Sequence, residues 1–184
     1  MREAGGVLWS MAFDRVGVVV SDLYFVDPNP GPGQEGAERG VRLELRAFAR
    51  DELHGSIYSA VPIRVDRPLW RVDLLESVSS TPGSLDRAHH HPRFRGWEPG
   101  RRHFVEELTA DPVVWLQGRF DDIESVLADA GVEADELGSG DVAALRAAGP
   151  MIVAAVEHLL GEVAAGRAGL EPAGAGAAVR ASWL

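Results

Sequence analysis

The sequence contains neither cysteine nor lysine: Cys is 0, and all 18 basic residues are arginine. The lack of cysteine excludes disulfides, thiolate catalysis, iron–sulfur clusters and cysteine-rich zinc sites. The lack of lysine excludes Schiff-base chemistry and a P-loop lysine. The chain is rich in alanine, glycine and arginine, which indicates that codon bias in a GC-rich genome is the cause of the missing lysine. The chemical exclusion holds whatever the cause.

Long apolar runs are missing as well. No stretch approaches the ~18 consecutive apolar residues of a membrane span, and the N-terminus lacks the basic start and apolar run of a secretory signal. We therefore expect a cytoplasmic protein without membrane contact. A chain of 184 residues, 46% of them hydrophobic and 25% charged, is typical of one globular domain. We place this domain at residues 1–166 and an Ala/Gly-rich tail at 167–184.

The first part of the chain predicts strands. Residues 16–26 are rich in β-branched and aromatic side chains, and residues 41–50 alternate between apolar and polar ones. Residues 56–65 and 69–75 have similar patterns, with a turn expected at 66–68. Because the connections are short, we expect an antiparallel meander of about four strands over residues 16–75.

The last part of the chain predicts two helices, over residues 111–130 and 141–165. Asp111 is suited to cap the first helix with Pro112 at its first position, and Gly131 is suited to end it. The second helix contains Gly149 and Pro150, which should kink or split it. Strands followed by helices predict an α+β domain, in which the helices pack over one face of the sheet.

Between these parts, residues 76–104 show no sustained period and predict a long loop, which is usually functional or mobile. The segment RAHHHPRFRGWEPGRRHF within it holds four of the six histidines and five of the 18 arginines. It is the one region of the sequence where titratable and metal-competent side chains gather, and we place the candidate site there.

A metal site is the leading hypothesis for this segment. In an extended chain, His89 and His91 point to the same side and His90 to the other. Glu98 or His103 would complete the ligand set, and Zn, Mn or iron(II) would accept these nitrogen and oxygen donors. The spacing from Gly83 to His91 is similar to the first half of the cupin metal motif. The cupin glutamate is not at its expected place, and no second motif follows.

A metal-free RNase or phosphodiesterase is the alternative. Here His89, His91 or His103 would be the general acid or base, and Arg101 and Arg102 would bind an anion. The net charge of -10 makes DNA binding unexpected but leaves a local contact with RNA. A third interpretation is an ordered surface loop in which Phe94, Trp97 and Phe104 are packing anchors.

The whole net charge lies in residues 105–141, which carry 11 acidic residues and only Arg119. A helix with this charge is most often a solvated face. It also predicts a non-enzymatic module that binds a basic protein partner. The acidic side chains of the first predicted helix would make that contact: Asp121, Asp122, Glu124 and Asp129.

A polar face also follows from the alternation of the predicted strands. It carries Arg42, Glu44, Arg71 and Asp73 among others. We expect cross-strand ion pairs on a solvated face, with a polar pocket inside a curled sheet as the alternative.

By the segments HHHPRFRGWEPGRRHF and RPLWRVDLLES, the chain resembles an uncharacterised domain of actinobacterial proteins, which has no established activity. Over residues 41–130, its strands, histidine cluster and closing helix are also similar in pattern to small TumE-like toxins. This second resemblance implies RNase activity but transfers no catalytic residue.

Overall fold

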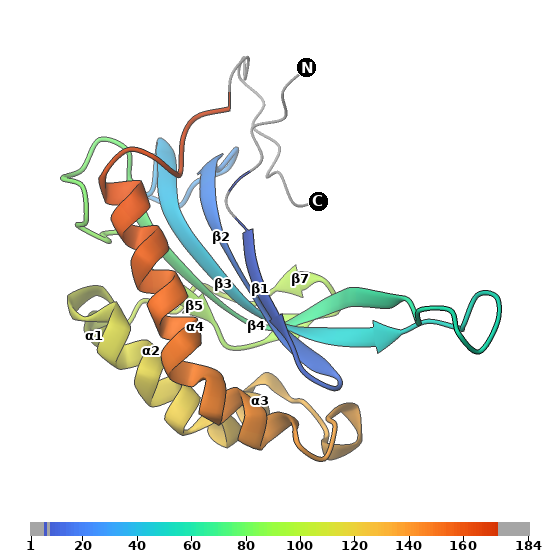
Figure 1. Cartoon of the computed structure of the whole chain (residues 1–184). Helices are drawn as coiled ribbons and strands as arrows, with labels where there is room; N and C mark the ends of the chain where they lie inside the picture. The colour runs from blue at the N-terminus through green and yellow to red at the C-terminus, as the bar shows by residue number, and fades with distance from the viewer. Residues whose placement is uncertain (1–5, 7, 173–184) are drawn as a thin grey trace.

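The computed structural model describes residues 6 and 8–172 and shows an α+β fold (Figure 1). Five strands form an antiparallel sheet in chain order: β1 (Leu8–Ala12), β2 (Val16–Val26), β3 (Ala37–Arg50), β4 (Ile63–Ser77) and β5 (His89–His91). The predicted fold class is therefore confirmed, with one strand more than expected. Strands β1 and β5 were not predicted. The two strands predicted at residues 56–65 and 69–75 are replaced by a single strand, β4.

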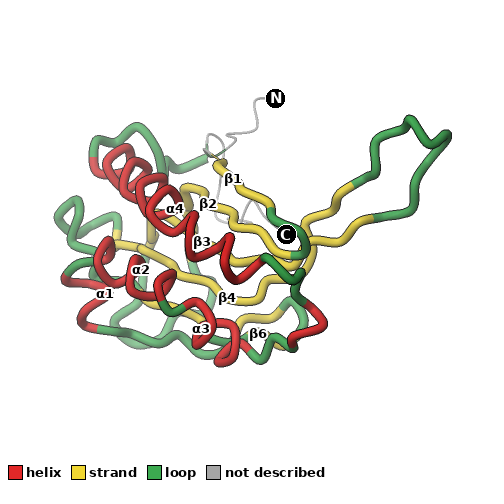
Figure 2. The backbone as a smooth tube through the Cα atoms, turned by 60° about the horizontal axis from the view of Figure 1, so that its bottom comes forward, coloured by secondary structure: helices red, strands yellow, loops and turns green. Residues whose placement is uncertain are grey.

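The single strand β4 corrects the predicted turn at residues 66–68. Pro68 has no N–H and cannot complete a regular ladder. The register between β3 and β4 shifts around Arg46, opposite Pro68, and the Arg46 side chain donates a hydrogen bond of 2.7 Å to the Asp66 carbonyl. This irregularity lets the strand continue past the proline. Residues 51–62 form the loop of a projecting two-stranded arm (Figure 2).

The predicted long loop at 76–104 also contains structure. Besides the end of β4 and all of β5, it holds a small hairpin of β6 (Phe94–Arg95) and β7 (Glu98–Pro99). Strands β5, β6 and β7 each have only two or three residues, too few for a period to show in the sequence.

The helices are α1 (Glu106–Ala110), α2 (Pro112–Asp121), α3 (Ile123–Ala130) and α4 (Asp141–Ala164). The Asp111 side chain accepts a hydrogen bond from the Val114 N–H, and Gly131 ends α3 with a φ of 73°, both as predicted. The prediction of one continuous helix over residues 111–130 is wrong: the backbone leaves helical geometry at Asp122, which separates α2 from α3. Phe120 and Ile123 on either side of this break are both buried.

Helix α4 is not split at Pro150. The proline lies on an exposed side of the helix, where water can bond the carbonyl that it leaves without a donor. By length and composition alone, α4 could cross a membrane. Its buried apolar side chains, however, belong to the hydrophobic core, and the helix contacts α2, β2 and β3 as a core helix does.

The core lies between the helices and one face of the sheet. The apolar members of the alternating strands point into it, among them Val18, Val20, Leu43, Leu45 and Val72, each completely buried. Of the predicted tail at 167–184, residues 173–184 lie outside the described part of the chain. Ala168 packs into the core and the Gly169 N–H donates to Asp22 at 2.7 Å, so the folded unit extends beyond residue 166.

The close contact of α4 with α2 depends on Gly149. A Cβ at this position would lie 2.8 Å from the Phe120 Cβ. We expect Gly149→Ala to lower the free energy of unfolding by about 1–3 kcal/mol through overpacking. Gly161→Ala, in the same helix but with no atom within 4 Å of its Cβ, should raise it by up to about 1 kcal/mol. Urea denaturation measures both; a Gly149→Ala variant as stable as the parent contradicts the contact.

Candidate functional site

The second face of the sheet carries the candidate site. The register between β3 and β4 places Arg42 opposite Asp73 and Glu44 opposite Arg71. These are the predicted cross-strand ion pairs, but the face is not solvated as expected: the Asp73 side chain is only 1% exposed. The polar pocket, which was the alternative, is what the structure shows.

The β6–β7 hairpin covers part of this face. The Arg71 guanidinium stacks over the Phe94 ring at 5.5 Å, and the Arg46 guanidinium stacks over the Trp97 ring at 5.2 Å. Cation–π contacts of this kind hold an aromatic hairpin against a charged surface. Phe94 and Trp97 therefore contact arginines of the same chain. Of the three residues expected to be packing anchors, Phe94 is partly buried, whereas Trp97 and Phe104 are exposed.

Strand β5 brings the histidines to this face. It pairs with β4 so that His89 lies opposite Asp73 and His91 opposite Arg71. Because side chains alternate along a strand, both histidines point to the polar face and His90 points to the helix side. His89 and His91 thus point to the same side of the strand, as predicted.

The two histidines and Asp73 form a compact buried group. His89 Nε2 lies 3.4 Å and His91 Nε2 lies 3.5 Å from the same Asp73 oxygen, Oδ2. One ligand atom from each residue fits within 4.8 Å of the others, a spacing at which a single metal ion could be held. Asp73 is the member that the sequence analysis missed as a ligand, although it appeared on the predicted polar face.

The backbone fixes which nitrogen of each ring faces Asp73. His89 Nδ1 lies 2.7 Å from the Arg87 carbonyl, and His91 Nδ1 lies 2.8 Å from the Gly100 carbonyl. A carbonyl only accepts, so both Nδ1 atoms must carry hydrogen. In the neutral rings, both Nε2 lone pairs are then directed toward the carboxylate. Lone pairs that converge in this way call for a shared cation or a proton donor.

Two arginines supply part of that positive charge. The Arg42 Nε lies 2.6 Å from Asp73 Oδ1, and the Arg71 Nε lies 3.0 Å from Asp73 Oδ2. Burial alone would raise the pKa of Asp73. The charges of Arg42 and Arg71 outweigh it, and they hold this pKa well below its usual range.

Arg71 also lies beside His91. Its Nη2 atom is 3.1 Å from His91 Nε2, so the guanidinium donates to that lone pair. Burial lowers the pKa of His91, although the contact with Asp73 opposes the change. His91 therefore stays neutral at neutral pH, which is the form that accepts a donor or binds a metal.

The group opens into a cavity of about 280 Å³. The predicted residue Arg102 lies on its wall, with Phe25, Leu75 and Pro99 as apolar neighbours. Arg102 donates a hydrogen bond of 2.8 Å to the Gln34 side chain, which holds the guanidinium in place. The structure thus joins three of the predicted site residues, His89, His91 and Arg102, in one cavity.

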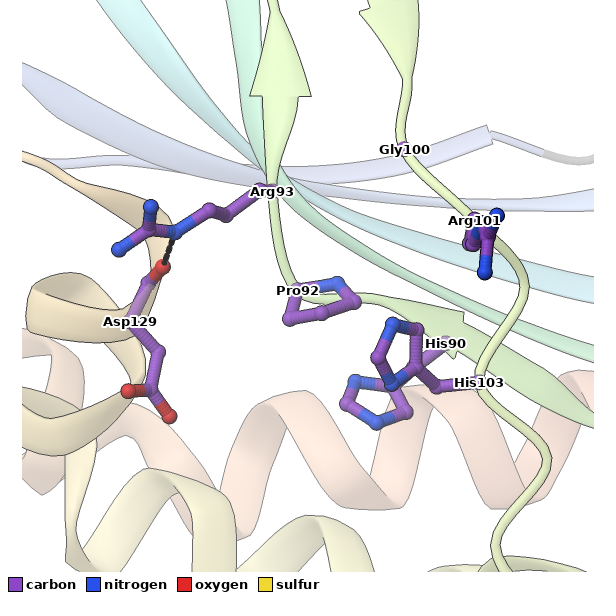
Figure 3. A pocket seen from close by; sticks show the side chains of 7 residues that line it. All are labelled: His90, Pro92, Arg93, Gly100, Arg101, His103 and Asp129. Atoms are coloured by element: carbon purple, nitrogen blue, oxygen red, sulfur yellow. Dashed lines mark hydrogen bonds between the residues drawn. The ribbon is translucent and has the colours of Figure 1, made fainter.

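The other predicted residues lie elsewhere. Arg101 and His103 line a second cavity of about 460 Å³ on the helix side of β5, together with His90 (Figure 3). The rings of His90 and His103 are 5.5 Å apart. Burial, with His103 next in effect, lowers the pKa of His90 to about 4. Glu98 is exposed on β7 and is not part of the buried histidine group.

The acidic side chains of the predicted helix are distributed over α2, the break at Asp122 and α3. Asp121, Asp122, Glu124 and Asp129 are all exposed, and Arg146 of α4 forms an ion pair with Glu124. The surface is therefore solvated and partly neutralised by the neighbouring helix.

Comparison with protein-family models, curated proteins and solved structures gave no match to this chain. Conclusions about function therefore depend on the geometry of the site alone.

The buried charge of Asp73 gives a test of the site geometry. Asp73→Asn would leave Arg42 and Arg71 buried without their carboxylate, and we expect a loss of about 3–5 kcal/mol in the free energy of unfolding. The control is Glu162→Gln, which breaks an exposed ion pair with Arg167 and should hardly change the urea midpoint. Equal stability of Asp73→Asn and the parent would show that the carboxylate is not the centre of the charge cluster.

Proposed function

We propose that the chain is a small metal-dependent protein that binds one divalent ion, Zn, Mn or iron(II), through Asp73, His89 and His91. One observation carries the proposal: the Nε2 atoms of His89 and His91 and one carboxylate oxygen of Asp73 converge on a common point. Two ligand atoms that each lie about 2.1 Å from a metal at the tetrahedral angle are about 3.4 Å apart. The distances of 3.4 and 3.5 Å from Asp73 Oδ2 match this spacing.

The surroundings of the ligands support the same conclusion. Histidine ligands of metals nearly always donate their second ring N–H to a carbonyl or carboxylate, as His89 and His91 do here. A set of two histidines and one carboxylate leaves coordination positions open, which is typical of catalytic rather than structural ions. These positions would face the cavity of about 280 Å³, so we propose an enzyme rather than a structural metal site.

Arg71 is the residue that competes with the ion. Its guanidinium donates to His91 Nε2, the lone pair that the metal would use. Binding therefore requires Arg71 to leave His91 while Arg42 keeps its contact with Asp73 Oδ1. The chemistry that the ion supplies when bound is Lewis-acid activation of an oxygen, and the chain's part is to fix the two histidine rings and exclude water.

Metal content of the untagged protein tests this proposal. After dialysis against Zn, Mn or iron(II), we expect about one ion per parent chain and none in the His89→Ala, His91→Ala double variant. His90→Ala is the matched control, because it removes a histidine of the same strand that points to the other side; it should keep the ion. Circular dichroism checks that each variant is folded. Failure of the folded parent to bind any of the three ions above pH 7 rejects the proposal.

We propose metal-free cleavage of RNA as the second candidate, because His103 and Arg101 share the second cavity with His90 (Figure 3). His90 is neutral at neutral pH, since burial lowers its pKa to about 4. It could therefore accept a hydrogen bond from a substrate hydroxyl, while Arg101 contacts the phosphate. His103 would take the proton from the attacking hydroxyl as its oxygen bonds to phosphorus, and would return a proton to the leaving oxygen when the old P–O bond breaks.

Cleavage of single-stranded RNA in excess chelator tests the second candidate. Activity should persist in chelator and fall about 100-fold or more in His103→Ala, the usual range for loss of a general acid or base. His54→Ala, on the exposed loop of the projecting arm, is the control and should behave as the parent does. Activity that chelator removes, or that His103→Ala leaves intact, speaks against this candidate.

A further inference from the structure

The metal proposal leaves an excess of positive charge in the buried site. Asp73 is the one carboxylate at the metal ligands, and Arg42 and Arg71 already form ion pairs with it. Two further carboxylates lie nearby and are also shared: Glu44 lies 2.8 Å from Arg46 and 3.9 Å from Arg71, and the buried Glu38 lies 3.6 Å from Arg102. A divalent ion adds two positive charges to this region. Buried charge without a counter-charge is unfavourable, and the site therefore needs an anion when it holds a metal.

Arg102 provides a place for that anion. It lies on the wall of the cavity that the metal ligands line. Of its N–H groups, one donates to Gln34 in the described structure. Its carboxylate neighbours, Asp27 at 3.5 Å and Glu38 at 3.6 Å, lie beyond a close hydrogen bond. The planar guanidinium thus keeps donors for a ligand, and a guanidinium fork fits the oxygens of a phosphate group.

We propose that the cavity binds the phosphate group of a small phosphate ester. Arg102 would hold the phosphate on one side, and on the other side the phosphate would contact the metal and Arg71, which leaves His91 when the metal binds. This inference rests on the proposed metal site and names its ligand class. A phosphate group carries nearly two negative charges at neutral pH, which balances a divalent ion as a single carboxylate could not. The cavity of about 280 Å³ is at the lower end for ligand pockets and suits a small ester, whose organic part would contact Phe25, Leu75 and Pro99.

The proposal has a thermodynamic consequence: metal and phosphate must strengthen each other's binding by the same factor. We expect inorganic phosphate to tighten Mn²⁺ binding about tenfold relative to chloride at equal ionic strength, within the usual range of such couplings. The electron paramagnetic resonance signal of unbound Mn²⁺ measures the affinity directly. Isothermal titration with phosphate, with and without Mn²⁺, should give the same factor.

Two neighbouring arginines provide the variant and its control. Arg102→Gln should abolish the effect of phosphate, so that the Mn²⁺ affinity of this variant is the same in phosphate as in chloride. Arg101→Gln, whose side chain lines the other cavity, should keep the full effect. Burial raises the pKa of Glu38, and loss of the Arg102 charge in the variant would raise it further. Circular dichroism verifies that the variant is folded.

The outcomes separate this inference from the proposed function. If Mn²⁺ binds and phosphate does not change its affinity, the phosphate site is wrong and the metal site stands. If Mn²⁺ does not bind but phosphate binds to the metal-free protein in a manner that Arg102→Gln removes, the metal proposal fails and the phosphate site is supported. If neither binds, both are overturned.

Discussion

The burial of the Asp73 carboxylate is the constraint on which the site depends. A charged group that is removed from water requires partners on every side. Arg42 comes from β3 and Arg71 from the same strand as Asp73, while His89 and His91 come from β5. The contacts of Arg42, His89 and His91 follow from the antiparallel register of neighbouring strands, and that of Arg71 follows from the two-residue period of β4 itself. The site is therefore a property of the sheet itself, built on its most rigid elements rather than on loops.

The segment that closes the site connects β5 to the helices. Its hairpin stacks Phe94 and Trp97 on arginines of the sheet and so covers part of the polar face, while Pro99 and Gly100 form one side of the cavity. Gly100 supplies the carbonyl that fixes the His91 ring and lines both cavities. A Cβ at Gly100 would lie 2.8 Å from the Arg93 carbonyl, so the absence of a side chain is what lets this backbone approach so closely.

The sequence predicts the fold class because the alternation in β3 and the helix signals at Asp111 and Gly131 are local. It also predicts that His89 and His91 point the same way, because that follows from an extended backbone alone. It does not lead to Asp73 as their partner, because this contact depends on the pairing of β5 with β4, and three residues are too few to reveal a strand. Glu98 and His103 are nearer in sequence, but tertiary structure directs them elsewhere.

The register of β5 determines which histidine meets which cavity. A shift by one residue would send His90 to Asp73 and turn His89 and His91 toward the helices. Both sides of the strand oppose such a shift. On one side β5 pairs with β4, and on the other the backbones of His90 and His103 exchange two hydrogen bonds, of 2.9 and 3.0 Å. His90, which lines the second cavity, thus contributes to the first through its backbone, since its bridge to His103 keeps the rings of His89 and His91 directed at Asp73.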